Sequence, residues 1–537
     1  MKRLLILSTI LWLATAAPIF SDDDSHHHED LTAEQFGTVR FPVSCNAAAQ
    51  KQFEQGVALL HSFWYERAQA TFKQVVGTDP QCAMAHWGIA MSLWHQLWNH
   101  PDAAMVKAGA SEVDKARALH AKTEREREYV AAVGAFYGGP ADSSYQTRAD
   151  AYSKAMEKIY QEHPDDLEGS AFYALSLLAS EPDNDTTFAN RKQAAAVLEK
   201  LFAVEPDHPG VAHYLIHSYD KPQLAELGLP AARRYAQIAP AAPHALHMPS
   251  HIFARLGLWD DDIASNLASV AATRKTAAMG GEGHQFHAMD FLSYAYLQNG
   301  HEADAQRLID EIRAMPAKKD DMYGMDFDPR ISALVTFPAR QELELHQWSD
   351  AAALALVPGA STGDNSITYW ARAIGAARGG DPVAGRKNLN EIASIKKTLI
   401  EQKKPQFAEA ADQDYQEAAA WIEHAEGKND EAANILRTIA EKEEAEGDEP
   451  LAIPAREMLA DMLLDMNHPE QALLEYEADL KFNPNRFDGL YGAAHAAEIA
   501  GKSAQANTYY AQLVKMCSGS NSERPELQHA RTLLAQK

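Results

Sequence analysis

Small and aromatic residues recur in this chain at a spacing of about 34 residues. Three copies are clear: Gly56, Ala68, Phe72 and Pro80; Ala460, Ala472, Tyr476 and Pro484; and Ala494, Ala506 and Tyr510. Small residues twelve positions apart let one helix lie close to its partner, an aromatic residue sixteen positions after the first of them fills the remaining space, and proline ends the second helix. The spacing therefore predicts repeated helix pairs rather than a globular mixed fold.

This pattern resembles the tetratricopeptide repeat family, and weaker copies extend it over most of residues 45–515. They run from Gly300 to Ala305, from Gly380 to Gly385 and from Gly427 to Ala432. The resemblance implies an all-α, right-handed superhelical solenoid of about 9–11 helix pairs. Such solenoids present a concave groove, and the groove surface decides what is bound, so we expect a protein or peptide partner there.

Residues 61–65 and 79–88 look like those of a group of exported bacterial tetratricopeptide proteins of unassigned function. That resemblance supports the fold and the compartment and implies no mechanism. The beginning of the chain agrees, since Lys2 and Arg3 precede an apolar run from Leu4 to Leu13 and the small residues 14–16, as in a cleaved signal peptide. An uncleaved anchor is the alternative. We expect an exported protein, periplasmic or secreted, without stable membrane insertion.

The expected organisation follows from these features. It comprises a signal peptide (1–16), an acidic, histidine-rich, disordered linker (17–44), N-terminal repeats (45–206), histidine-rich central repeats (207–316), C-terminal repeats (317–515) and a C-terminal end (516–537). The chain has 49 basic and 75 acidic residues and a net charge of −26, which disfavours binding to nucleic acid.

Three cysteines in an exported protein suggest one pair and one free thiol. Cys45 precedes the first helix of one repeat and Cys82 begins the corresponding helix of the next. Neighbouring first helices stack side by side, so we expect a disulfide between them. We expect Cys517 to be free.

Seven of the 23 histidines fall within residues 213–287. Counted back from the expected core aromatics Tyr219, Phe253 and Tyr296, they repeat in register. His217 and His251 lie two before the aromatic, His213 and His247 six before, and His244 and His287 nine before. These spacings place them on the groove face of successive first helices.

Two histidines four apart on a helix can reach one metal ion. His213 with His217 and His247 with His251 form two such pairs, and adjacent helices pack closely enough for the pairs to converge on one ion or on a close pair of ions. We therefore predict a site for copper, zinc, iron or nickel. Its ligands are expected among His213, His217, His244, His247, His251, His287 and Asp290. Asp290 or Asp220 would complete the shell or orient a ligand ring.

Other interpretations stay open. The histidines would instead recognise a polar ligand or simply pack, and Pro249 would break the helix between His247 and His251. Trp94 and Trp98, four apart, are candidate ligand contacts, with core packing as the alternative. Familiar hydrolase, nucleotide-binding and metalloprotease motifs are missing, so the sequence leaves open whether the protein is an enzyme using the histidine cluster or a metal-free binding scaffold.

Overall fold

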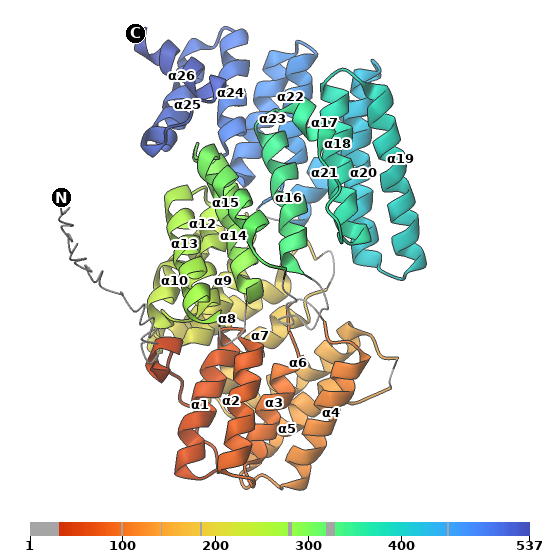
Figure 1. Cartoon of the computed structure of the whole chain (residues 1–537). Coiled ribbons are helices and arrows are strands. Elements are labelled where there is room, and N and C mark those ends of the chain that lie inside the picture. The colour runs from red at the N-terminus through yellow and green to blue at the C-terminus, as the bar shows by residue number, and fades with distance from the viewer. Residues whose placement is uncertain are drawn as a thin grey trace, which may run out of the picture. The chain divides into compact units, whose positions relative to one another are not determined.

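Short connections join successive helices, and each helix packs on the next one along the chain (Figure 1). The computed structural model describes residues 32–97, 100–140, 142–182, 185–277, 282–317, 328–447 and 451–536. Within these ranges the regular structure is helical and includes no strand. The predicted all-α architecture of paired helices is confirmed. None of the helices in the same ranges is long and apolar enough to cross a membrane.

The helices fall into three successive sets. The N-terminal set contains η1 (Ala33–Phe36), α1 (Ala47–His61), α2 (Tyr65–Thr78), α3 (Ala83–Ser92), α4 (Ala103–Ala118), α5 (Glu124–Tyr137), α6 (Tyr145–Glu162), α7 (Leu167–Ala179) and α8 (Ala189–Val204). The central set contains α9 (Pro209–Tyr219), α10 (Ala225–Ile238), α11 (Pro243–His247), α12 (Pro249–Arg255), α13 (Trp259–Lys275), α14 (Glu282–Gln298) and α15 (Glu302–Ala314). The C-terminal set contains α16 (Pro329–Glu344), α17 (Trp348–Ala353), α18 (Thr362–Arg378), α19 (Pro382–Glu401), α20 (Pro405–Ala425), α21 (Asn429–Glu446), α22 (Ala455–Asp465), α23 (Pro469–Phe482), α24 (Phe487–Ile499), α25 (Ser503–Met516), η3 (Cys517–Gly519) and α26 (Pro525–Ala535).

The repeated small residues lie where aromatic rings touch the backbone of a neighbouring helix. A Cβ atom added to Gly56 would come within 2.7 Å of the Phe72 ring, and one added to Gly88 would strike the same ring. Gly492 meets Tyr476 in the same way near the end of the chain. Glycine at these positions therefore sets how closely the helices approach.

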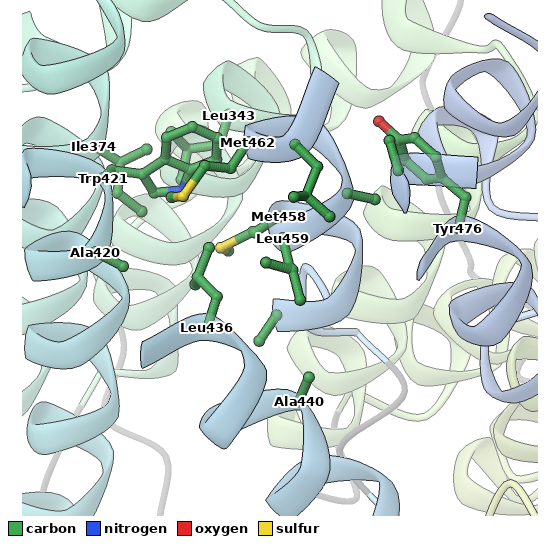
Figure 2. Close-up of a cluster of buried hydrophobic side chains, with 14 of the residues drawn as sticks. Leu343, Ile374, Ala420, Trp421, Leu436, Ala440, Met458, Leu459, Met462 and Tyr476 are labelled. Atoms are coloured by element: carbon green, nitrogen blue, oxygen red, sulfur yellow. The ribbon is translucent and has the colours of Figure 1, made fainter. Parts of the chain in front are cut away.

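Apolar side chains join the C-terminal helices into one core. Figure 2 shows Leu343 of α16, Trp421 of α20, Leu436 of α21 and Met458 of α22 gathered in this cluster. Each is buried, so burial of apolar surface supplies the main driving force for stacking these helices.

Contacts between distant repeats depart from a simple solenoid, in which each repeat touches only its neighbours. Helix α1 packs on α9, and α14 packs on α24. Lys221 donates to the backbone carbonyls of Glu446 and Gly447 over 2.7 and 2.9 Å. These contacts cover parts of the surface that an open solenoid would leave in solvent.

A buried arginine connects the central and C-terminal helices. The Arg486 guanidinium donates to Glu344 of α16 over 2.9 Å, to Glu457 of α22 over 2.7 Å and to the hydroxyl of Tyr294 on α14 over 2.5 Å. Arg486 is 1% exposed, and both carboxylates are buried. The arginine is therefore the countercharge for two carboxylates that lie out of water.

Replacing Arg486 by methionine should lower the free energy of unfolding by about 3–5 kcal/mol, because two carboxylates would remain buried without a cation. Urea unfolding followed by circular dichroism measures the change. The matched control is Arg386→Met, which removes an exposed arginine paired with Glu423 and Glu426 and should cost at most about 1 kcal/mol. Equal losses in the two variants would contradict the role given to Arg486.

The segment before α1 is ordered by packing rather than disordered as expected for 17–44. Phe36, Val39 and Phe41 are buried, and the backbone amide of Phe41 donates to Glu54 over 3.1 Å. Sequence reasoning weighed the acidic composition of the linker and overlooked these alternating apolar residues. The predicted signal peptide and residues 17–31 of the linker lie outside the described residues.

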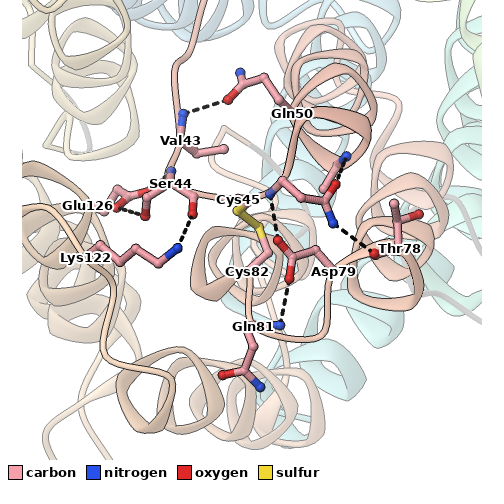
Figure 3. The surroundings of a disulfide bond; sticks show 12 residues. Val43, Ser44, Cys45, Gln50, Thr78, Asp79, Gln81, Cys82, Lys122 and Glu126 are labelled. Carbon is pink, nitrogen blue, oxygen red and sulfur yellow. Dashed lines mark hydrogen bonds between the residues drawn. A yellow bond between two sulfur atoms is a disulfide. The ribbon is translucent and has the colours of Figure 1, made fainter.

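The predicted disulfide is present between Cys45 and Cys82, whose Cα atoms are 5.0 Å apart. Figure 3 shows that hydrogen bonds surround it. The Asn46 amide donates to Asp79 over 2.7 Å, and the Ser44 amide donates to Glu126 over 2.6 Å. The bridge therefore fastens the start of α1 to the start of α3. Cys517 is a free, buried thiol, as predicted.

Changing both Cys45 and Cys82 to serine should lower the free energy of unfolding by about 4 kcal/mol, the chain-entropy value for a closed loop of this length. The sequence separation is 37 residues. Urea titrations of the oxidised protein and the variant measure the difference. If reduction of the wild-type disulfide lowers the free energy of unfolding by the same amount, the loss comes from the crosslink. Full stability after reduction would contradict the prediction.

Candidate metal centre

The clustered histidines converge from three places in the central repeats. Helix α9 supplies His213 and His217, the α11–α12 segment supplies His244, His247 and His251, and α14 supplies His284 and His287. Helices α9 and α12 are in contact, and α14 contacts both α11 and α12. Stacking of consecutive first helices therefore brings these side chains into one buried region.

Three of them form what we call the first histidine group: His213, His217 and His244. The Nε2 atom of His213 lies 3.1 Å from that of His217 and 3.1 Å from that of His244. All three residues are buried, and His213 has no exposed surface. Three imidazole nitrogens thus point at one small volume.

Three more form the second histidine group: His247, His251 and His287. The Nε2 atoms of His247 and His251 are 3.1 Å apart, and candidate ligand atoms of the three residues lie within 4.8 Å of one another. Helix α11 ends at His247 and α12 begins at Pro249, so the helix breaks between the two histidines, as expected. The break still allows their ring nitrogens to meet.

The two groups are neighbours. Ring centroids are 6.0 Å apart for His244 and His247 and 6.3 Å apart for His217 and His251. Ions held by the two groups would therefore occupy adjacent positions.

Hydrogen bonds that Nδ1 donates orient three of the six ligand rings. His213 donates to the backbone carbonyl of His61 over 2.6 Å, and His247 donates to Oδ1 of Asn266 over 2.7 Å. The side-chain amide nitrogen of Asn266 donates to Asp262. This hydrogen bond turns the Asn266 oxygen toward His247. Such outer contacts hold metal-binding histidines in the tautomer that leaves Nε2 free for an ion.

The third of these hydrogen bonds joins His251 to Asp220. This is the ring-orienting role that the sequence analysis expected for Asp220 or Asp290. Nδ1 of His251 donates to Asp220 over 2.8 Å, and Arg255 donates to the other carboxylate oxygen over 3.0 Å. Although burial favours the neutral acid, Arg255 and His251 hold the pKa of Asp220 well below its usual value. The carboxylate is therefore an acceptor, and His251 must carry its proton on Nδ1.

These assignments leave nitrogen lone pairs facing each other. His247 and His251 both donate through Nδ1, so in their neutral forms both Nε2 atoms present lone pairs across 3.1 Å. In the first group, the single Nε2 lone pair of His213 faces two neighbours at the same distance. A cation between the nitrogens would turn this repulsion into attraction.

Burial keeps five of the six imidazoles neutral, which is the form that binds metal. It lowers the pKa of His213 and of His287 to about 3. Burial also lowers the pKa of His217, His244 and His247, and neighbouring imidazoles add to each shift. Protonation therefore competes poorly with a metal ion near neutral pH.

One phenylalanine covers each group. The Phe63 ring lies 4.4 Å from that of His213 and also contacts His217 and His244. Phe63 connects α1 to α2 with a φ of 52°, a strained value for a bulky residue. Phe291 of α14 lies 4.9 Å from His247 and 4.5 Å from His251. Apolar walls of this kind keep water away from the nitrogens.

A third cluster, His61, Glu168 and His208, supports the first group. Glu168 accepts from His61 over 2.8 Å and from His208 over 3.0 Å, and the Tyr214 hydroxyl lies 2.8 Å from the other nitrogen of His61. Hydrogen bonds within the protein satisfy these groups, so the cluster needs no ion. It fixes His61, whose carbonyl orients His213.

The remaining predicted site residues lie elsewhere. Asp290 is not part of the centre, because Arg340 of α16 pairs with its carboxylate at 2.7 Å. Trp94 is not an accessible ligand contact, since it is fully buried and stacks on Phe136 at 3.9 Å. Trp98 lies outside the described residues.

The structure brings one further residue, His284, to the site, and the predicted ligand set did not include it. His284 is buried, and its ring centroid lies 5.1 Å from that of His244. Neither of its ring nitrogens has a hydrogen-bond partner among the described residues. Its spacing of three from His287, one helical turn, was the available signal.

Changing Asp220 to asparagine should weaken metal binding at the second group by about 10–100-fold, the usual cost of losing an outer-shell partner of a ligand histidine. Competition titration with a chromophoric chelator measures the affinity. Asp290→Asn is the matched control and should leave the affinity unchanged, since Asp290 pairs with Arg340 instead. The same loss in both variants, or in neither, would contradict this assignment.

Comparisons with known proteins assign no family. No protein-family model and no curated protein matches this chain. Among solved structures, a human IFIT1 dimer with m7Gppp-AAAA is 12% identical over 81% of this chain and 90% of that chain, with a TM-score of 0.33. The APC/C hetero-tetramer Cut9-Hcn1 is 10% identical over 77% and 85%, with a TM-score of 0.35. Scores this low support no conclusion about a ligand or partner, and the paired-helix architecture rests on the contacts of the chain itself.

Proposed function

We propose that this chain is a metal-binding helical-repeat protein that holds two transition-metal ions, one in each histidine group. The proposal rests on the facing Nε2 atoms of His247 and His251, which lie 3.1 Å apart. Because both residues donate through Nδ1, both Nε2 atoms have a lone pair for a metal ion. The first group repeats the arrangement one repeat earlier. Copper, zinc, iron and nickel all accept such imidazole ligands.

The repeat scaffold suits this role. Each ligand histidine lies on or beside a helix that is packed on both sides, and rigid elements hold metal ligands more accurately than loops do. Three protein ligands per ion also leave a coordination position open, as in catalytic rather than structural sites. A redox or hydrolytic enzyme is therefore the main extension of the proposal.

We also propose that the protein acts in an oxidising compartment after export. The disulfide between Cys45 and Cys82 supports this, because such bonds persist mainly in exported proteins. The basic and apolar residues at the start of the sequence support the same compartment.

A metal-free peptide-binding scaffold is the second candidate. An open cleft of about 730 Å³ between α6, α7 and α8 favours it, with Lys154, Glu157, Tyr173 and Asn190 in its lining. The cleft offers charged and hydrogen-bonding groups to an extended chain. It lies on a different part of the protein from the histidine groups, so the two candidates can be tested separately.

Elemental mass spectrometry of the purified protein tests the metal proposal, with His26, His27 and His28 replaced by alanine so that they cannot contribute. We expect about two transition-metal ions per chain after reconstitution and dialysis. Changing His247 and His251 to alanine should remove about one ion, because the second group alone loses its ligands.

His86→Ala is the control, since His86 on α3 pairs with Glu112 and belongs to neither group. Its metal content should match that of the parent protein. Absence of bound metal from the parent after reconstitution would overturn the proposal and favour the scaffold with the α6–α8 cleft.

A further inference from the structure

The two histidine groups differ in their access to solvent. The members of the first group are all buried, whereas His251 and His287 of the second group are partly exposed. The His251 side chain is 13% exposed. The second group is therefore the more exposed end of the centre, and the first group is its closed end.

The six candidate ligands are all neutral imidazoles. The nearest carboxylate, Asp220, contacts Nδ1 of His251 and so acts one step away from the ion. Iron sites that activate oxygen characteristically include a carboxylate ligand, which neither group supplies. The donor set therefore favours an ion that binds well to imidazole alone.

Charge points to copper. Two dications would bring four positive charges into a region walled by Phe63 and Phe291, whereas two copper(I) ions bring two. Fewer buried charges without anionic ligands cost less desolvation free energy. Copper(II) also binds nitrogen donors more tightly than the other divalent ions do. The site would therefore retain copper in both oxidation states.

His284 indicates that something further binds beside the ions. It is buried next to the first group, with no hydrogen-bond partner for either nitrogen among the described residues. A buried polar group without a partner costs free energy unless a ligand or water satisfies it. The ring therefore has a nitrogen available for a ligand bound at the open coordination positions.

We propose that the two histidine groups together form a dinuclear copper centre that binds dioxygen and reduces it to peroxide, with His284 contacting the bound oxygen. The inference rests on the proposed metal-binding function. Each copper(I) ion gives up one electron and becomes copper(II), and dioxygen accepts the two electrons, keeping a single O–O bond. The step needs no proton and no other reactant, and the adjacency of the groups lets both ions bind one oxygen molecule.

The test loads the purified full-length protein with copper(I) under anaerobic conditions and then admits dioxygen. We expect about two copper ions per chain, uptake of about one dioxygen per copper pair, a peroxide-to-copper(II) charge-transfer band in the near ultraviolet and no electron paramagnetic resonance signal, since bridged copper(II) ions couple. His86→Ala should behave as the parent does.

His287→Ala removes one partly exposed ligand of the second group. It should lose the band and give a visible copper(II) signal in air, while circular dichroism confirms unchanged helix content. Two bound coppers in the parent that take up no dioxygen, or that oxidise to two uncoupled copper(II) ions, would overturn this inference and leave the metal-binding function standing. Binding of zinc but not copper would overturn it as well, and failure to bind any metal would instead remove the proposed function.

His284→Leu separates the contact to oxygen from ligation of copper. The variant should keep about two copper ions, and its peroxide form should decay at least about tenfold faster, as loss of a hydrogen bond to a charged group predicts. An unchanged lifetime, or loss of a copper ion, would overturn the assignment of His284 to the bound oxygen.

Discussion

Contact between a small residue of one helix and an aromatic ring of the next is the interaction on which the rest of this structure depends. Phe72 lies against both Gly56 and Gly88, so one ring sets the separation of three successive helices. Close packing of this kind also fixes the rotation of each helix about its axis. The face that carries the histidines is therefore determined by residues that never touch them.

Histidine positions repeat because the helices repeat. His213 and His247 occupy the same place in consecutive first helices, and each has a second histidine four residues later. Stacking these helices generates two adjacent groups with similar geometry. Contacts from distant repeats then complete the centre, since Phe63 and the carbonyl of His61 come from the first repeat of the chain.

Local periodicity explains how much of this could be predicted from the sequence. The paired helices, the disulfide and the convergence of six histidines all follow from spacings within one or two repeats. Asp290 was misassigned because its partner, Arg340, lies 50 residues later and shares no spacing with it. The division of the histidines into two groups, the role of Asn266 and the cover provided by Phe63 depend on how helices pack in three dimensions, which spacing alone does not specify.

Long-range contacts also decide what kind of solenoid this is. Arg486 joins helices α14, α16 and α22, and α1 packs on α9. Five of the seven clustered histidines are buried rather than open to a peptide. Burial lowers the pKa of His217 and of His247. A face that would serve as a binding groove in an open array is here suited to hold ions.

Anomalous X-ray diffraction from crystals of the metal-reconstituted protein tests the central claim most directly. The account predicts two anomalous peaks per chain, one in each histidine group, each about 2.0–2.1 Å from three imidazole nitrogens, the distance at which imidazole binds zinc and similar ions. Absence of a peak from both groups, with water or a shared proton between His247 and His251, would contradict it.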